Sequence, residues 1–457
     1  MTDDKEFLGK EPVNKLLFKL ALPTVIAQLV NVLYNIVDRI YIGHMPGDGA
    51  LALTGVGVCM PLILVVSAFA ALVSSGGAPR ASISMGKNDY AHAENILGNC
   101  FSVLLIISAV LTTVLLVFNR PLLLLFGASN NTISYASSYI TIYALGTVFV
   151  QLTLGMNMFI TAQGFAKTGM LTVLIGAVCN IILDPVFIFI FGMGVRGAAL
   201  ATIISQAISC IWCVKFLCSD KSFLRIRRKY LLIKRNIIVP CLTLGTATFI
   251  MQLSESIIAV CFNSSLLKYG GDVAVGAMTI CTSTMQFAML PLQGIGQGAQ
   301  PISSYNYGAR NVARVKETFR LLLIICLIYS VSLYLGIMLF PRAFASIFSN
   351  DSALIDYSAN ALRIYCAVLF VFGIQVSCQL TFTSIGNALY SIIVAVVRKF
   401  VLLIPLIYIL PNLNILQDKT MAVYMAEPVA DIIAVTFTAI IFAWQFKTAL
   451  KKLEILK

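Results

Sequence analysis

Two carboxylates stand inside long apolar stretches of the sequence, where a charged side chain is costly. Asp38 follows the segment NVLYNIV, and Asp184 is the one charged residue of the segment CNIILDPVFIFIFG. A charge at the centre of a membrane-spanning helix costs about 2.5–3.5 kcal/mol on the insertion scale, so such residues usually face a cavity or a partner. The two aspartates are therefore the first candidates for chemistry in this chain.

Helical rise places other oxygen atoms near these carboxylates. At about 1.5 Å per residue, Asp184 lies roughly 12 Å from the end of its apolar run, and Asp38 lies roughly 9 Å from the end of its own. Thr202 lies roughly 9 Å into the next run, and Asn180 shares a helix face with Asp184 because the two are four residues apart. Carboxylate, amide and hydroxyl oxygens suit H⁺ or a hard cation such as Na⁺. The pattern predicts a cation-coupling site, in which the same four residues are the metal ligands if the ion is Na⁺.

The alternative is that these groups hydrogen-bond between helices and only hold the bundle together. Two carboxylates at one level favour the ion site, because a hydrogen-bonding role rarely needs both. Gln28, Asn31 and Asn35 precede Asp38 at helical spacing and form one polar stripe on an apolar helix. We expect the stripe to line a cavity that takes substrate.

The second half of the chain carries charges of both signs inside apolar runs. These are Glu255, Arg363, Arg398, Lys399, Glu427 and Asp431, three of each sign. The balance favours a buried ion-pair network over an independent ion site. The three carboxylates are also candidates for a substrate cavity, because an anionic group there could meet a cationic substrate unless an arginine already neutralises it.

The composition is that of a membrane protein. Hydrophobic residues make up 59% of the 457 residues and charged residues 11%, against about 45–50% and about 25% in soluble proteins. Long continuous apolar runs predict helices rather than barrel strands, so the expected fold is an all-α polytopic membrane protein. Twelve spans are predicted, at 17–42, 51–78, 96–118, 133–163, 169–192, 197–218, 238–267, 273–302, 319–340, 354–385, 389–411 and 421–446.

Basic residues predict the topology. Of the 32 Lys and Arg residues, five lie in loops on one side and 20 in segments on the other side. Seven lie within the bounds of the predicted spans, and three of these (Lys19, Lys215 and Arg320) lie at the span ends nearest the second side, which brings the count for that side to 23. The positive-inside rule then puts both termini and the basic segment 219–237 in the cytoplasm. The net charge of +13 reflects this bias and does not indicate nucleic-acid binding. The first apolar run lacks the features of a cleaved secretory signal.

A long-period repeat divides the chain. Sliding the sequence by 222 residues aligns 49–166 with the second half without a gap. The matched pairs include Gly49 and Gly271, Gly86 and Gly308, Arg120 and Arg342, and Gly164 and Gly386. Six spans per unit is an even number, so the halves are a parallel repeat of two pseudo-symmetric six-helix bundles, a transporter architecture. The predicted lobes are 1–218 and 238–457, joined by a linker at 219–237.

Several segments resemble the multidrug and toxic compound extrusion family, and its bacterial multidrug exporters most of all. They are KLALPTVIAQLVNVLYNIVDRIYIGH (19–44), GGAPRASISMGKND (76–89), NIILDPVFIF (180–189) and GQGAQPISSYNYGARN (296–311). The resemblance implies two lobes around a V-shaped cavity in the cytoplasmic membrane of a bacterium. It further implies export of organic cations and amphipathic drugs, driven by inward flow of Na⁺ or H⁺. It also implies a first-lobe cation site that falls on Asp38, Asn180, Asp184 and Thr202, and a hinge in the first span at Pro23.

The hypothesis is therefore an antiporter in a membrane lipid environment, acting as a monomer on small drug molecules. An alternative is a flippase for lipid-linked or other anionic precursors, since Arg363, Arg398 and Lys399 could face an anionic head group. An enzyme is the third class, but with two histidines a metal or nucleophile constellation is not expected. Neither is a cofactor. The major facilitator superfamily shares the parallel six-helix halves, but its signature is missing from the loop 79–95.

Overall fold

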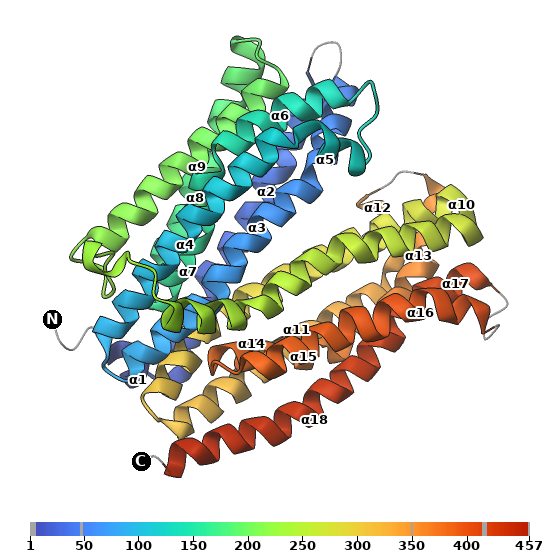
Figure 1. Ribbon diagram of the computed structural model, residues 1–457. Helices are drawn as coiled ribbons and strands as arrows, with labels where there is room; N and C mark the ends of the chain where they lie inside the picture. Colours follow the sequence, from blue (N-terminus) through green and yellow to red (C-terminus); the bar gives the residue numbers. More distant parts are fainter. Residues whose placement is uncertain (1–5, 46–48, 349–350, 414–417, 456–457) are drawn as a thin grey trace.

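The computed structural model describes residues 6–45, 49–348, 351–413 and 418–455, and these residues form helices and connecting turns without any strand. The polypeptide folds into two bundles of helices, one from each half of the chain (Figure 1). The first bundle contains α1 (Phe7–Lys10), α2 (Val13–Gly43), α3 (Gly49–Gly86), α4 (Tyr90–Val117), α5 (Asn119–Leu125), α6 (Ile133–Leu145), α7 (Thr147–Ala162), α8 (Ala166–Pro185), η2 (Val186–Ile190) and α9 (Val195–Cys218).

The second bundle follows a connection that holds the short helix η3 (Arg228–Tyr230). Its helices are α10 (Arg235–Gly308), α11 (Val312–Leu339), α12 (Pro341–Ser346), α13 (Ser352–Tyr365), η4 (Leu369–Val371), α14 (Phe372–Ser384), α15 (Ala388–Val396), η5 (Val397–Leu403), α16 (Ile404–Ile409), η6 (Leu410–Asn412), α17 (Lys419–Tyr424) and α18 (Ala426–Ile455).

The described residues provide twelve membrane spans. Nine helices are individually long and apolar enough to cross a membrane, and the two bent pairs, α6 with α7 and α13 with α14, raise the number to eleven. Helix α10 has 74 residues, and its backbone leaves the helical region at Gly271, where φ is 64° and ψ is −161°. It therefore supplies two spans, so the predicted number of twelve is confirmed.

Two expected straight spans are broken. We predicted single helices over 133–163 and 354–385, but α6 and α7 meet at an angle of 58° and α13 and α14 at 46°. Hydropathy could not show these bends, because a break of a few residues leaves the apolar run continuous. The bends fall at equivalent places in the two halves.

Backbone conformation follows the repeat as well. Asn88 and Arg310 both have positive φ, at 61° and 56°, and so do Gly164 and Gly386, at 89° and 74°. Each pair is separated by 222 residues, which is the offset found in the sequence. An L residue rarely adopts positive φ, so these shared turns support two copies of one structural unit.

The bundles meet along α3 and α10, where glycines allow the helices to touch. A side chain at Gly76 would overlap the carbonyl oxygen of Cys241, and one at Gly245 would overlap that of Leu72. The pair Gly86 and Gly308 makes the same kind of contact further along the two helices. Figure 1 shows that the bundles meet near the two termini and diverge toward the opposite end.

Candidate functional site

The first-lobe site is built where α8 and α9 lie side by side. The amide nitrogen of Asn180 donates to the Asp184 carboxylate at 3.2 Å and to the Thr202 hydroxyl at 3.5 Å. Asn180 and Asp184 are almost completely buried. Thr202 also donates to the backbone carbonyl of Ala198 at 3.0 Å, so its oxygen is held in place about two turns into α9.

Asp38 reaches the same site from α2. Its side chain is buried, and its carboxyl group lies beside that of Asp184, near enough for the two to interact directly. The structure thus brings together the four residues predicted from depth and spacing. Three helices that are far apart in the sequence supply them.

This arrangement leaves oxygen atoms without partners. One carboxylate oxygen of Asp38, one of Asp184 and the amide oxygen of Asn180 are buried and accept no hydrogen bond from the described residues. A buried oxygen without a partner costs about 1–3 kcal/mol, and more when it is charged. Oxygens from two carboxylates and one amide are the ligands that H⁺ or Na⁺ prefers, so the donor set fits such an ion.

The helix next to Asp184 has an unusual local form. After Pro185 the α-helix gives way to a π-helical turn, η2, in which Phe191 N–H bonds to the carbonyl of Val186 at 2.9 Å. Proline removes one backbone donor from the ladder, and π turns are frequent at functional sites. We predicted a continuous helix over 169–192, so η2 is a correction that sequence periodicity could not supply.

Two tyrosines at this site were missed by sequence reasoning. Tyr139 and Tyr143 of α6 are buried and stack with their ring centroids 6.3 Å apart. Tyr139 lies close to both Asp38 and Thr202. A signal was present, since two tyrosines four residues apart in an apolar span share one helix face, but nothing in the sequence said that this face meets α2 and α9.

The polar stripe of α2 makes two kinds of contact. Gln28 donates to Gln297 of α10 at 3.2 Å, so it joins the two lobes. Asn35 donates to the backbone carbonyl of Asn31 at 2.6 Å. Pro23 is buried within α2, which remains one continuous helix in this conformation.

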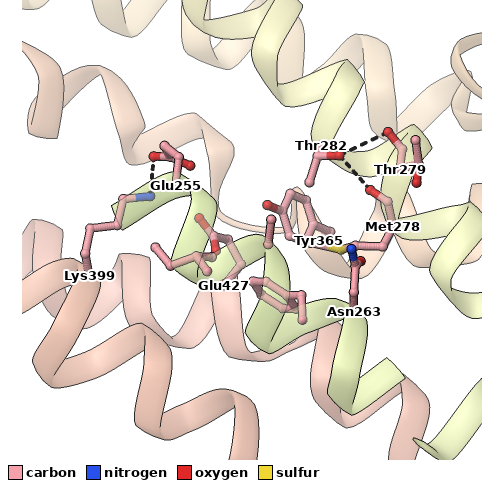
Figure 2. A pocket seen from close by; sticks show the side chains of 11 residues that line it. Glu255, Asn263, Met278, Thr279, Thr282, Tyr365, Lys399 and Glu427 are labelled. Carbon is pink, nitrogen blue, oxygen red and sulfur yellow. Dashed lines mark hydrogen bonds and ion pairs between the residues drawn. The ribbon is translucent and has the colours of Figure 1, made fainter. Parts of the chain in front are cut away.

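The second lobe holds a network of charges within the bundle. Arg398 lies between two carboxylates, at 2.6 Å from Asp431 and 3.2 Å from Glu427, and its guanidinium lies over the Phe372 ring. Lys399 pairs with Glu255 at 2.9 Å, as Figure 2 shows. Both cations lie on the π-helical segment η5, which turns two consecutive residues toward carboxylates of α18 and α10.

The charge balance of this network differs from our expectation. Arg363 on α13 is exposed, and among the described residues no ion pair links it to the network. The expected balance of three cations and three carboxylates is therefore wrong, and the network contains two cations and three carboxylates. A count of charges along the sequence could not separate an exposed residue of a span from one that packs within the bundle.

Comparison with known proteins agrees with this architecture. The MatE family model matches residues 23–186 and 247–409, one segment in each half. The chain is 25% identical to the multidrug export protein MepA of Staphylococcus haemolyticus strain JCSC1435 over 436 residues, which is 95% of each chain. It is 23% identical to MepA of Staphylococcus aureus strain N315 over 423 residues, 92% of each chain.

Solved structures show the same fold. A crystal structure of MATE in complex with MaD3S superimposes with a TM-score of 0.90, at 23% identity over 98% of this chain and 99% of the other. An outward-facing multidrug resistance MATE family transporter of the MOP superfamily gives 0.89, at 23% identity over 98% of both chains. Fold and site thus define a membrane-spanning transporter and not an enzyme. The chain belongs to the MatE family, whose model covers most of it.

Proposed function

We propose that this transporter exports organic cations and amphipathic drugs across the cytoplasmic membrane, in exchange for Na⁺ or H⁺. The observation that supports the exchange is the set of buried, unpartnered oxygens on Asp38, Asn180 and Asp184. Two adjacent ionised carboxylates repel each other in a site of low dielectric. Uptake of one cation relieves that repulsion, so ion binding and the conformation of this lobe are coupled.

The orientation follows from the basic residues. If the termini are cytoplasmic, as the positive-inside rule requires, the bundles meet at the inner side and diverge at the outer side (Figure 1). The described conformation is then outward-facing. Residues 1–218 and 238–457 would rock as units about the glycine contact, with 219–237 as their linker, and ion uptake from outside would weaken substrate binding before the return step.

The test is ion-driven transport by Asp184→Asn protein in proteoliposomes. An Na⁺ gradient and a pH gradient are imposed one at a time, and ethidium movement is followed by fluorescence. We expect wild-type protein to respond to one gradient and the variant to lose that response. Asp356→Asn is the matched control, because Asp356 is half-exposed in an ion pair with Arg342 and its loss removes one carboxylate far from the site.

Undiminished, still ion-dependent transport by Asp184→Asn would refute the coupling assignment. Transport that responds to neither gradient in wild-type protein would refute antiport itself. The first outcome concerns only the role of Asp184, and the second concerns whether the protein is an antiporter at all.

The flippase alternative has less support. It requires free cationic groups that face an anionic head group, but two of the three candidates, Arg398 and Lys399, are already paired with carboxylates, and only Arg363 is left for that role. Accumulation of a lipid-linked precursor on deletion, with unchanged drug sensitivity, would favour it over drug export.

A further inference from the structure

The linker between the two bundles carries cations without a carboxylate partner. Arg225 pairs with Asp220 at 2.6 Å, and Arg227 pairs with Glu94 at 2.7 Å. The next four cations are exposed, and among the described residues no ion pair joins them to a carboxylate: Arg228, Lys229, Lys234 and Arg235. Like charges this close together repel one another, so this part of the linker attracts a negative partner from outside the chain.

The backbone of the linker is fixed to α4, beside which it runs from the end of α9 to the start of α10 (Figure 1). The amide oxygen of Asn99 accepts from the backbone N–H of Lys234 at 2.6 Å, and its amide nitrogen donates to the carbonyl of Tyr230 at 3.2 Å. Ser102 donates to the carbonyl of Leu231 at 2.7 Å. The four cations therefore belong to a backbone segment that α4 holds in one position.

The same contacts put the linker at the level of the membrane surface. The predicted span 96–118 begins three residues before Asn99 and six before Ser102, so these two anchors lie roughly 4.5 and 9 Å inside the apolar run. Leu232 and Ile233 stand between the two pairs of cations, and their exposed fractions are 78% and 43%. Exposed apolar side chains beside cations are typical of a segment in the membrane interface, where the apolar groups reach the acyl chains and the cations reach the phosphates.

We propose that the segment 228–235 binds the head group of an anionic phospholipid. The four cations neutralise its phosphate groups, and Leu232 and Ile233 insert beside its acyl chains. Helix α10 begins at Arg235, and the partial positive charge at a helix N-terminus adds to the attraction.

A lipid fits this surface better than a soluble polyanion does. A soluble polyanion would neutralise the cations but leave the two apolar side chains in water. The bound lipid ties the joint between the two bundles to the membrane surface. The inference depends neither on the coupling ion nor on the exported drug, so it goes beyond the proposed function.

The test measures lipid binding to purified full-length protein in detergent. The protein is titrated with dioleoylphosphatidylglycerol or with dioleoylphosphatidylcholine, and native mass spectrometry gives the affinity of the lipids that it retains. We expect one phosphatidylglycerol to bind at least about tenfold more tightly than phosphatidylcholine, and we expect the difference to shrink as the salt concentration rises. Replacement of all four cations by glutamine should weaken that binding at least about tenfold.

Two further proteins show whether the effect belongs to this site. The first replaces by glutamine the same number of exposed cations on α11 and α18, and it should bind the lipid as wild-type protein does: Lys316, Lys447, Lys451 and Lys452. The second, Asn99→Ala, keeps every charge but removes two bonds between the linker and α4. It should weaken lipid binding severalfold, because the site is no longer preorganised.

The proposal is overturned if wild-type protein binds both lipids equally, or if the fourfold glutamine variant binds phosphatidylglycerol as tightly as wild type. Unchanged binding in Asn99→Ala would overturn it as well, since the surface would then be a diffuse charge and not a built site. If the fourfold variant does not fold, the pairs Arg228→Gln with Lys229→Gln and Lys234→Gln with Arg235→Gln are measured separately, and each should weaken binding about threefold or more.

A last variant separates a lipid from a soluble polyanion. Leu232→Ser keeps all the cations and should weaken lipid binding severalfold, because an apolar contact with the acyl chains is lost. If a soluble oligonucleotide displaces the lipid and Leu232→Ser binds the lipid as tightly as wild-type protein, the proposal is overturned in favour of a soluble polyanion.

Discussion

Removal of the Arg398 guanidinium should destabilise the second lobe more than any surface charge change. Arg398 lies 2.6 Å from Asp431 and 3.2 Å from Glu427, and all three side chains are at most 8% exposed. In Arg398→Met the apolar volume is largely kept. The two carboxylates, however, lose their common partner inside the bundle.

The size of the effect follows from the burial. Removing one partner of a buried ion pair costs about 3–5 kcal/mol, because the remaining charge stays desolvated. Here two carboxylates are left, but Lys399 is on the same segment, η5, and can move toward one of them. We therefore expect a loss of about 3–5 kcal/mol in the free energy of unfolding rather than twice that value.

Unfolding of the Arg398→Met protein can be followed through its buried cysteines. Most of its free cysteines are buried, at positions Cys59, Cys100, Cys210, Cys213, Cys241, Cys281, Cys326, Cys366 and Cys378. A fluorogenic thiol dye therefore reports unfolding during a thermal ramp in detergent. Lys316→Met is the matched control, because the Lys316–Glu454 pair is 3.9 Å long and more than half exposed on both sides; such pairs contribute about 0–1 kcal/mol.

A second set of variants tests the reason for the effect. Adding Glu427→Gln and Asp431→Asn to Arg398→Met removes the unpaired charges, and most of the lost stability should return. The reasoning is refuted if Arg398→Met melts together with wild-type protein. It is also refuted if the triple variant melts no higher than the single one, since the loss would then come from packing against Phe372.

Three further changes test other parts of the structure. Gly76→Ala should lower the apparent melting temperature, because its methyl group would overlap the backbone of α10. Gly57→Ala, with open space around the glycine, should raise the melting temperature slightly, because alanine adds about 0.5–1 kcal/mol of helix stability. Arg314→Gln should speed amide exchange in residues 6–11 about tenfold in mass spectrometry, because Arg314 bonds to the carbonyls of Leu8 and Glu11 in this segment; the same exchange rate as wild type would contradict this. Tyr139→Phe should reduce ion-driven ethidium transport severalfold while leaving folding intact, since its ring remains and its hydroxyl next to the first-lobe site is lost; full transport would show that the hydroxyl has no role.

Much of the fold was predictable because helices that cross a membrane appear in the sequence as long apolar runs. A helix must be about 20 apolar residues long to cross the hydrocarbon core, so hydropathy alone located the spans. The 222-residue offset was visible in part because Gly164 and Gly386 occupy equivalent turns with positive φ, a conformation that glycine adopts readily. The bends at α6–α7 and α13–α14 could not be seen, because they interrupt the helix without interrupting the apolar run.

The first-lobe site was predictable for a similar reason. Asp38 and Asp184 are expensive at membrane depth, which made them candidates for a site, and helical rise gave their level. Tyr139 and Tyr143 were not predicted, because a tyrosine is common in an apolar span and carries no such cost.

The sequence by itself thus determined which residues are buried in the membrane and at what depth, because both depend on distance along a single helix. Only the tertiary structure decided how the helices are rotated and which faces meet. Rotation leaves Arg363 exposed and turns Arg398 and Lys399 inward, although all three are cations within apolar spans. That choice sets the net charge of the buried network in the second lobe, because a charge counts in such a network only when packing between helices removes it from water and lipid.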